Sequence, residues 1–212
     1  MDIAEIAARA PVIPVLTIDR VADAVSLAQA LVRGGLPVLE ITLRTPAALE
    51  ALKAIAADVP EAIVGAGTVL NEAQLDLAQA AGARFGVSPG CTPALASAAR
   101  KAGMPFLPAV QTVSEALGLA EQGFTVLKFF PAGSAGGPGW LKAITAPLPD
   151  IRFCPTGGIS QENAPTYLAL PNVSCVGGSW VAPPAAVAAG RWDDIERLAA
   201  AAATLKRGLP HA

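Results

Sequence analysis

A lysine inside an apolar segment is the residue of this sequence best suited to covalent chemistry. Lys128 lies in the segment TVLKFFP, where Leu127 precedes it and Phe129 follows it. Burial among apolar groups lowers the pKa of an amine by several units, and an unprotonated amine can attack a ketone. The alternative is a structural lysine that pairs with a core carboxylate such as Glu40 or extends to the mouth of the fold. The residue pattern alone leaves both interpretations open.

Three polar residues alternate along a second apolar segment, VLEITLR. Glu40, Thr42 and Arg44 are each two residues apart, so in a strand their side chains share one face. If that face is buried, the carboxylate needs a partner or a function, because an unpaired buried charge is costly. The pattern alone leaves open whether Glu40 has a structural partner or a chemical function.

Few other residues are available for acid-base or metal chemistry. The single histidine, His211, lies in the segment 206–212, which we expect to be a flexible tail. Three cysteines at wide spacing, with no C-x-x-C motif, predict neither a disulfide framework nor a zinc site. We therefore expect no metal and no cofactor, and proton transfer by carboxylate, lysine, tyrosine or water.

Two glycine-rich turns follow the last two predicted strands. Thr156, Gly157 and Gly158 come after the seventh strand, and Gly178 and Ser179 come after the eighth. Backbone amides in such turns bind phosphate, and β/α barrels have phosphate sites at this position. Each turn alone can be an ordinary loop, whereas the two together predict a phosphate site.

Two further turns place small side chains at strand ends. Thr68 follows Gly67 at the end of the third predicted strand, and Pro89 follows Ser88 after the fourth. Both turns could also be simple connections between a strand and a helix.

The elements that must position these residues alternate along the whole chain, as is typical of repeated β/α units. The predicted strands are 12–17, 37–43, 62–68, 83–88, 104–109, 125–130, 151–155 and 173–177. The predicted helices are 19–33, 46–58, 71–81, 92–102, 113–122, 138–146, 161–169 and a final helix at 185–205. The candidate residues fall at the C-terminal ends of the strands, where barrel enzymes place their active sites.

Eight units without a G-x-G-x-x-G motif after the first strand favour a TIM (β/α)8 barrel over an open doubly wound sheet. We expect one domain over residues 1–212. A net charge of −2 provides no electrostatic surface for nucleic acid or anionic membrane. The first residues contain neither a basic start nor a long apolar run, so we expect a cytoplasmic protein. Its partners should be small molecules or copies of itself.

Six segments carry a resemblance to a known family: VLEITLRT, EAIVGAGTVLN, VSPG, LKFFPA, RFCPTGGIS and VGGSW. In this order they resemble the 2-keto-3-deoxy-6-phosphogluconate (KDPG) aldolases. These are class I enzymes of the Entner-Doudoroff pathway that often also accept 2-keto-4-hydroxyglutarate (KHG). The resemblance runs from the first strand to the final helix, and the segment 133–139, GSAGGPG, departs from the more usual version with Glu and Asn.

The resemblance implies a metal-free homotrimer that cleaves KDPG to pyruvate and glyceraldehyde 3-phosphate. Lys128 would be the Schiff-base lysine, and Glu40 would shuttle protons. The residues implied near the pyruvyl moiety are Arg44, Thr68, Pro89, Phe130 and Thr156, and those implied at the phosphate are Gly157, Gly158, Gly178 and Ser179.

Other functions remain open from the residues. One is an aldolase for the galactonate epimer. A second is a sugar-phosphate isomerase or synthase that uses Lys128 and Glu40 only as acid and base. A third is a catalytically silent phosphate-sugar sensor or oligomeric scaffold.

Overall fold

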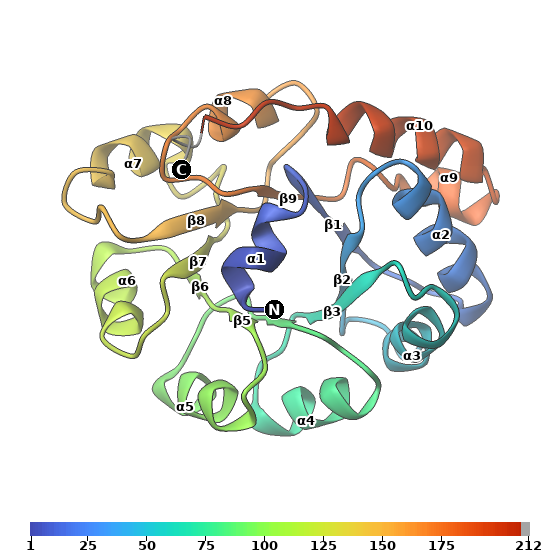
Figure 1. The fold of residues 1–212 in the computed structure, drawn as a ribbon, viewed down its shortest axis with the longest axis horizontal. Helices are drawn as coiled ribbons and strands as arrows, with labels where there is room; N and C mark the ends of the chain where they lie inside the picture. Colours follow the sequence, from blue (N-terminus) through green and yellow to red (C-terminus); the bar gives the residue numbers. More distant parts are fainter. Residues whose placement is uncertain (209–212) are drawn as a thin grey trace.

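Parallel strands form the centre of the molecule and helices surround them (Figure 1). The structure is a computed structural model that describes residues 1–208. A six-stranded sheet has the order β5-β4-β3-β2-β1-β9, and a three-stranded sheet has the order β6-β7-β8. The strands are β1 (Val12–Leu16), β2 (Val38–Thr42), β3 (Ile63–Gly67), β4 (Gly86–Val87), β5 (Phe106–Leu107), β6 (Ala109–Val110), β7 (Val126–Phe129), β8 (Arg152–Pro155) and β9 (Val176–Gly178). The predicted α/β fold with parallel strands is confirmed.

The fifth predicted strand, 104–109, is divided into two short strands. Pro108 separates β5 from β6, because proline has no N–H to donate to a strand ladder. Its carbonyl still accepts a hydrogen bond from the Lys128 amide at 2.9 Å. The segment around Pro108 therefore remains paired with β7. Ala109 is in register with Lys128, and Val110 with Phe129.

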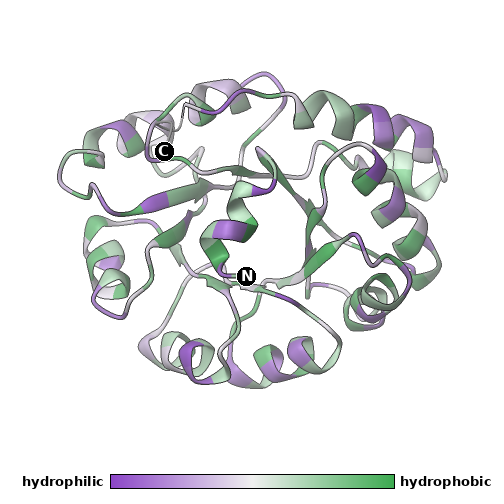
Figure 2. Cartoon of the chain, in the orientation of Figure 1, coloured by the Kyte–Doolittle hydropathy of each residue, from purple (hydrophilic) through white to green (hydrophobic). Residues whose placement is uncertain are grey.

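The helices follow the strands in alternation. They are α1 (Ile3–Ala8), α2 (Val21–Arg33), α3 (Ala48–Asp58), α4 (Glu72–Ala80), α5 (Pro93–Ala102), α6 (Val113–Ala120), α7 (Gly137–Ile144), α8 (Ala164–Leu168), α9 (Pro184–Ala188) and α10 (Trp192–Ala203). Asn71, Thr92 and Thr112 cap α4, α5 and α6 with side-chain oxygens, as residues of these types do at helix starts. Figure 2 shows apolar helix faces toward the strands and polar faces toward the outside.

The prediction of one final helix over 185–205 is wrong. Gly190 lies in the left-handed region, with φ of 63°, and ends α9 before α10 begins at Trp192. A glycine ends helices in this way because it adopts positive φ without a steric penalty. The break turns α10 onto α2, where Arg33 and Glu196 form an exposed ion pair at 2.7 Å.

A short N-terminal helix, which the sequence interpretation did not include, covers one end of the strands. Asp2 and Glu5 form a capping box at the start of α1. Ile6 and Ala7 join an inner apolar cluster with side chains from several strands, among them Ile13. Because α1 leads directly into β1, it covers the end at which the parallel strands begin (Figure 1). The opposite end, where the strands finish, carries the site.

The C-terminal segment is bonded to the body as far as the structure describes it. Arg207 donates to the Ala8 carbonyl at 2.9 Å, and the Gly208 amide donates to the Leu168 carbonyl at 2.7 Å. The rest of the predicted tail, with His211, lies outside the described residues. Within residues 1–208, none of the helices has both the length and the apolar character needed to cross a membrane.

Candidate active site

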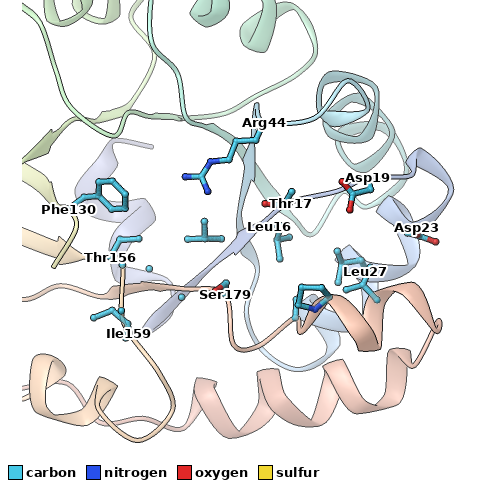
Figure 3. Close-up of a pocket in the computed structure, with 18 of the residues that line it drawn as sticks. Leu16, Thr17, Asp19, Asp23, Leu27, Arg44, Phe130, Thr156, Ile159 and Ser179 are labelled. Atoms are coloured by element: carbon cyan, nitrogen blue, oxygen red, sulfur yellow. The ribbon is translucent and has the colours of Figure 1, made fainter. Parts of the chain in front are cut away.

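A cavity of about 700 Å³ lies at the C-terminal ends of the strands. Its size falls within the range of small-molecule sites. Figure 3 shows labelled side chains entering it from the ends of β1, β2, β7, β8 and β9. The lining residues that the sequence predicted as site residues are Arg44, Lys128, Phe130, Thr156, Gly157, Gly158, Gly178 and Ser179.

Lys128 and Glu40 form a buried ion pair beneath this cavity. The Lys128 Nζ lies 3.1 Å from Glu40 Oε1 and 3.4 Å from Oε2. Their side chains are 5% and 4% exposed, so each charge depends on the other for compensation. Lys128 also lines the cavity. The pairing that would make Lys128 purely structural therefore exists, but the same amine faces a space large enough for a substrate.

The alternation of β7 explains why the lysine points to the interior. Leu127 and Phe129 are fully buried in the layer between strands and helices, where Phe129 stacks on Trp140 with ring centroids 4.3 Å apart. Successive side chains on a strand point to opposite faces, so Lys128 must point inward. Its Nζ lies 5.5 Å from the centroid of the Phe130 ring, a distance at which a cation is attracted by the ring face.

Arg44 is held at the cavity by Thr68. The Arg44 Nε donates to Thr68 Oγ1 at 2.9 Å, and Figure 3 shows the guanidinium pointing into the space between Phe130 and Thr17. Thr68 has φ of 60°, and within residues 1–208 it is the one non-glycine residue with a positive φ. This conformation costs a residue with a side chain about 1–2 kcal/mol. Strain of this kind is found at functional sites, and here it positions an arginine.

The glycine turn after β8 needs glycine at both positions. Gly157 and Gly158 have φ of 93° and 74°, which L-residues with side chains rarely adopt. The Gly157 carbonyl accepts from the Gly133 amide at 2.9 Å, and the Gly158 carbonyl accepts from Asn163 Nδ2 at 2.9 Å. The segment that departs from the family pattern thus begins with a residue that holds this turn. Asn163 was not singled out from the sequence.

Three predicted site residues are absent from the described lining of the cavity: Glu40, Thr68 and Pro89. Glu40 and Thr68 reach it through their bonds to Lys128 and Arg44. Pro89 is half-buried after β4 and has no such connection in the described part of the chain.

Gly67, at the end of β3, provides the space for the Glu40 side chain. A methyl group on Gly67 would overlap the Glu40 carboxylate and lie 2.6 Å from its Cγ. We therefore expect Gly67→Ala to displace the carboxylate and to lower kcat by about 100-fold, the scale that a 1 Å misplacement can produce. Steady-state assays would measure the loss, with Gly118→Ala as the control, because open space surrounds Gly118. Unchanged kcat in Gly67→Ala would contradict the requirement for this carboxylate position.

Two of the free thiols, Cys91 and Cys175, are poorly suited to nucleophilic chemistry. A hydrogen bond with Cys154, together with burial, raises the pKa of the Cys175 thiol well above its usual value. Burial raises the pKa of Cys91 to about 11. Because the thiolate is the reactive form of cysteine, neither residue competes with Lys128 as a nucleophile at neutral pH.

The sequence interpretation missed the part of the cavity wall formed after β1. Thr17, Asp19 and Arg20 line the cavity there, and Arg20 forms a two-bond ion pair with Asp23 at 2.8 Å for both bonds. The signal for them was available, because the rule that sites form at the C-terminal ends of strands applies to the first strand as well.

Comparisons with known proteins agree with the predicted resemblance. The family model described as KDPG and KHG aldolase matches residues 3–198. The 2-dehydro-3-deoxy-phosphogluconate aldolase of Pseudoalteromonas atlantica is 53% identical over 195 residues, which are 92% of this chain and 91% of that protein. The KHG/KDPG aldolase of Escherichia coli strain K12 is 51% identical, covering 89% of each chain.

A solved structure adds chemical detail about a relative. The KDPG aldolase of Legionella pneumophila, captured with pyruvate as a covalent carbinolamine intermediate, superimposes with a TM-score of 0.94. It is 45% identical and covers 96% of this chain and 99% of its own. With a family model over most of the chain and relatives above half identity, the assignment is plain: this chain belongs to the KDPG and KHG aldolase family.

Proposed function

We propose that this protein is a class I aldolase that cleaves KDPG to pyruvate and glyceraldehyde 3-phosphate, with Lys128 as the Schiff-base nucleophile. The observation that carries the proposal is the buried Lys128–Glu40 pair, 3.1 Å apart, at a cavity with an arginine and two glycine turns. The similarity to KDPG and KHG/KDPG aldolases supports the same chemistry, as does the covalent pyruvate intermediate of the Legionella protein.

Glu40 prepares Lys128 for attack. An ammonium has no lone pair, so Lys128 must first lose a proton, and the Glu40 carboxylate 3.1 Å away is positioned to take it. The free amine then adds to the C2 carbonyl of the substrate to form a carbinolamine. Glu40 returns its proton to the carbinolamine hydroxyl, which leaves as water. This step gives a protonated imine, the electron sink for the next step, and restores the Glu40 carboxylate.

Cleavage requires a base at the C4 hydroxyl. As Glu40 takes this proton, directly or through water, the C3–C4 bond breaks and its electron pair passes into the imine. The products are glyceraldehyde 3-phosphate and an enamine on Lys128. Protonation of the enamine at C3 and hydrolysis of the imine release pyruvate and regenerate the lysine. Phe130 and Thr156, which line the cavity, would border the reacting carbons.

The two ends of the cavity fit the two charged ends of KDPG. Arg44, with its Nε bonded to Thr68, presents the guanidinium to the pyruvyl carboxylate in a geometry suited to two parallel bonds. The backbone turns at Gly157-Gly158 and Gly178-Ser179 would hold the phosphate. Binding at both ends would hold C2 within reach of Lys128.

Arg44→Ala is therefore expected to raise KM for KDPG by about 10- to 100-fold, the scale of a lost charge-assisted hydrogen bond. Initial-rate measurements of pyruvate release would test this, with Arg100→Ala as the control because Arg100 is an exposed residue of α5. A KM for the Arg44 variant equal to that of the unchanged protein would remove Arg44 from carboxylate binding.

A substrate panel tests the proposed activity directly. Pyruvate release is measured from KDPG, from its galactonate epimer and from KHG, each with and without a chelator. We expect KDPG to have the highest kcat/KM, with no effect of the chelator. A higher value for the epimer would reassign the sugar, and chelator-sensitive release would contradict a Schiff-base mechanism.

We also propose that the two sheets close into one (β/α)8 barrel that forms a single domain over the whole chain. Parallel bridges between Thr156 and Gly177 and between Phe153 and Val173 support this, because they bring β8 beside the segment of β9. With β5 and β6 interrupted only at Pro108, the strands would then complete a ring. A crystal structure with continuous pairing of β8 and β9 is expected, and an open edge there would contradict closure.

A homotrimer in the cytoplasm is the proposed state of the protein in the cell. Leu70, just before α4, is 55% exposed, and Leu77, within α4, is 54% exposed. A neighbouring subunit could cover such apolar side chains. Cys91, Cys154 and Cys175 are free thiols, which suits a reducing compartment. Light scattering should give three times the chain mass of 21.3 kDa, and a monomer mass would contradict the trimer.

A further inference from the structure

Thr17 stands between the two ends of the proposed substrate. It follows β1 directly and lines the cavity with an exposed side chain. In the sheet, β1 pairs with β2 on one side and with β9 on the other. Arg44 follows β2, and Gly178 ends β9, so a molecule bound from Arg44 to the Gly178-Ser179 turn must pass the end of β1.

The hydrogen bonds around Thr17 determine what its hydroxyl can offer. Thr42 Oγ1 lies 2.9 Å from the Leu16 carbonyl, which can only accept, so the Thr42 hydroxyl proton is directed there. Thr17 Oγ1 lies 3.2 Å from Thr42 Oγ1, and Thr17 must therefore be the donor in that pair. With its proton committed, the Thr17 oxygen can act toward the cavity only as an acceptor.

An acceptor at this position selects for a hydroxyl group on the ligand. The pyruvyl carboxylate goes to Arg44, the C2 carbonyl to Lys128, the C4 hydroxyl to Glu40 and the phosphate to the glycine turns. The C5 hydroxyl is the donor of KDPG that these assignments leave without a partner. Figure 3 shows Thr17 across the cavity from Thr156, so the two hydroxyls would face different sides of a bound carbon chain.

We propose that Thr17 is a specificity-determining residue that accepts a hydrogen bond from the C5 hydroxyl of the substrate. This inference rests on the proposed aldolase function and adds the residue that distinguishes a hydroxylated aldehyde from one without the hydroxyl. Thr17 takes no part in breaking the C3–C4 bond. Its removal should therefore alter the preference between aldehydes and leave the chemistry at Lys128 intact.

The reverse reaction separates this role from a structural one. Purified protein is assayed for condensation of pyruvate with either of two aldehydes. The C2 hydroxyl of D-glyceraldehyde 3-phosphate becomes the C5 hydroxyl of the product, whereas 3-oxopropyl phosphate lacks that hydroxyl. Thr17→Val removes the acceptor with little change in shape, and Thr17→Ser keeps it. Thr166→Val is the matched control, because Thr166 is exposed on α8 and is not among the described lining residues of the cavity.

We expect Thr17→Val to lower kcat/KM for glyceraldehyde 3-phosphate by about 3- to 10-fold, the effect of one lost hydrogen bond. The value for 3-oxopropyl phosphate should stay within 2-fold, an allowance of about 0.4 kcal/mol. Thr17→Ser and Thr166→Val should keep the ratio between the two aldehydes. An equal loss on both aldehydes, or no loss on either, would overturn the inference.

Failure of the inference is distinguishable from failure of the proposed function. If the unchanged protein condenses neither aldehyde with pyruvate, the aldolase proposal fails and the role of Thr17 fails with it. If the unchanged protein condenses both and Thr17→Val keeps their ratio, the aldolase proposal stands and Thr17 has no part in reading the hydroxyl.

Discussion

Replacement of Lys128 with alanine is expected to abolish cleavage, with kcat for KDPG reduced by about 10⁴- to 10⁶-fold, the scale on which covalent enzymes lose activity without their nucleophile. Lys128 is the amine that both lines the cavity and lies 3.1 Å from a carboxylate able to take its proton. Without it, the C2 carbonyl has no route to an imine, and the C3–C4 bond has no electron sink. Pyruvate release at high protein concentration would measure the residual rate.

The alanine variant also leaves Glu40 buried without its partner. Breaking a buried ion pair in this way costs about 3–5 kcal/mol of folding free energy, so circular dichroism and thermal unfolding must accompany the assay. Lys128→Arg is the second variant, because an arginine keeps the positive charge beside Glu40 but stays protonated and cannot form an imine. Lys101→Ala is the control, since Lys101 is 83% exposed. Substantial turnover in a folded Lys128→Arg or Lys128→Ala variant would contradict the assignment.

Glu40→Gln is expected to lower kcat by about 10²- to 10⁴-fold, the contribution of a positioned acid-base group. The amide keeps the shape of the side chain but cannot take the proton of the C4 hydroxyl. Lys128 remains in place, so incubation with pyruvate and borohydride should still label it, more slowly. Stopped assays of pyruvate release and mass measurement of the labelled protein would give the two results.

The separation of these two results is what identifies Glu40 as the proton shuttle. Glu50→Gln, on the exposed side of α3, should change neither. If Glu40→Gln cleaved KDPG at the rate of the unchanged protein, another group would have to be the base. Complete loss of labelling in a folded Glu40→Gln variant would instead make Glu40 essential for imine formation.

The central residues could be predicted from the sequence because strand parity is a strong local rule. Lys128 between Leu127 and Phe129 had to face the interior once its neighbours faced the helices, and the structure places it there. Glu40, on the same face as Thr42, was predicted by the same alternation. The order of the parallel strands then brings side chains separated by 88 residues into contact, which the sequence could suggest only through the expected fold.

The features that the sequence did not reveal depend on three-dimensional contacts. The break at Gly190 could not be distinguished from a helix interior by composition, since alanine-rich segments lie on both sides. In the sequence Gly67 is an ordinary turn residue. The structure shows that its missing side chain leaves space for the Glu40 carboxylate. Thr17 acquires an acceptor role only because its hydroxyl bonds to Thr42, whose own proton goes to the Leu16 carbonyl.

The most direct test of the account is chemical trapping of the proposed imine. The protein is incubated with pyruvate and borohydride, digested, and examined by mass spectrometry for a lysine that carries a reduced three-carbon adduct. The account predicts that Lys128 carries this adduct, that Lys101 does not, and that labelling inactivates the enzyme in proportion to its extent. Active protein in which Lys128 remains unmodified under these conditions would contradict the account.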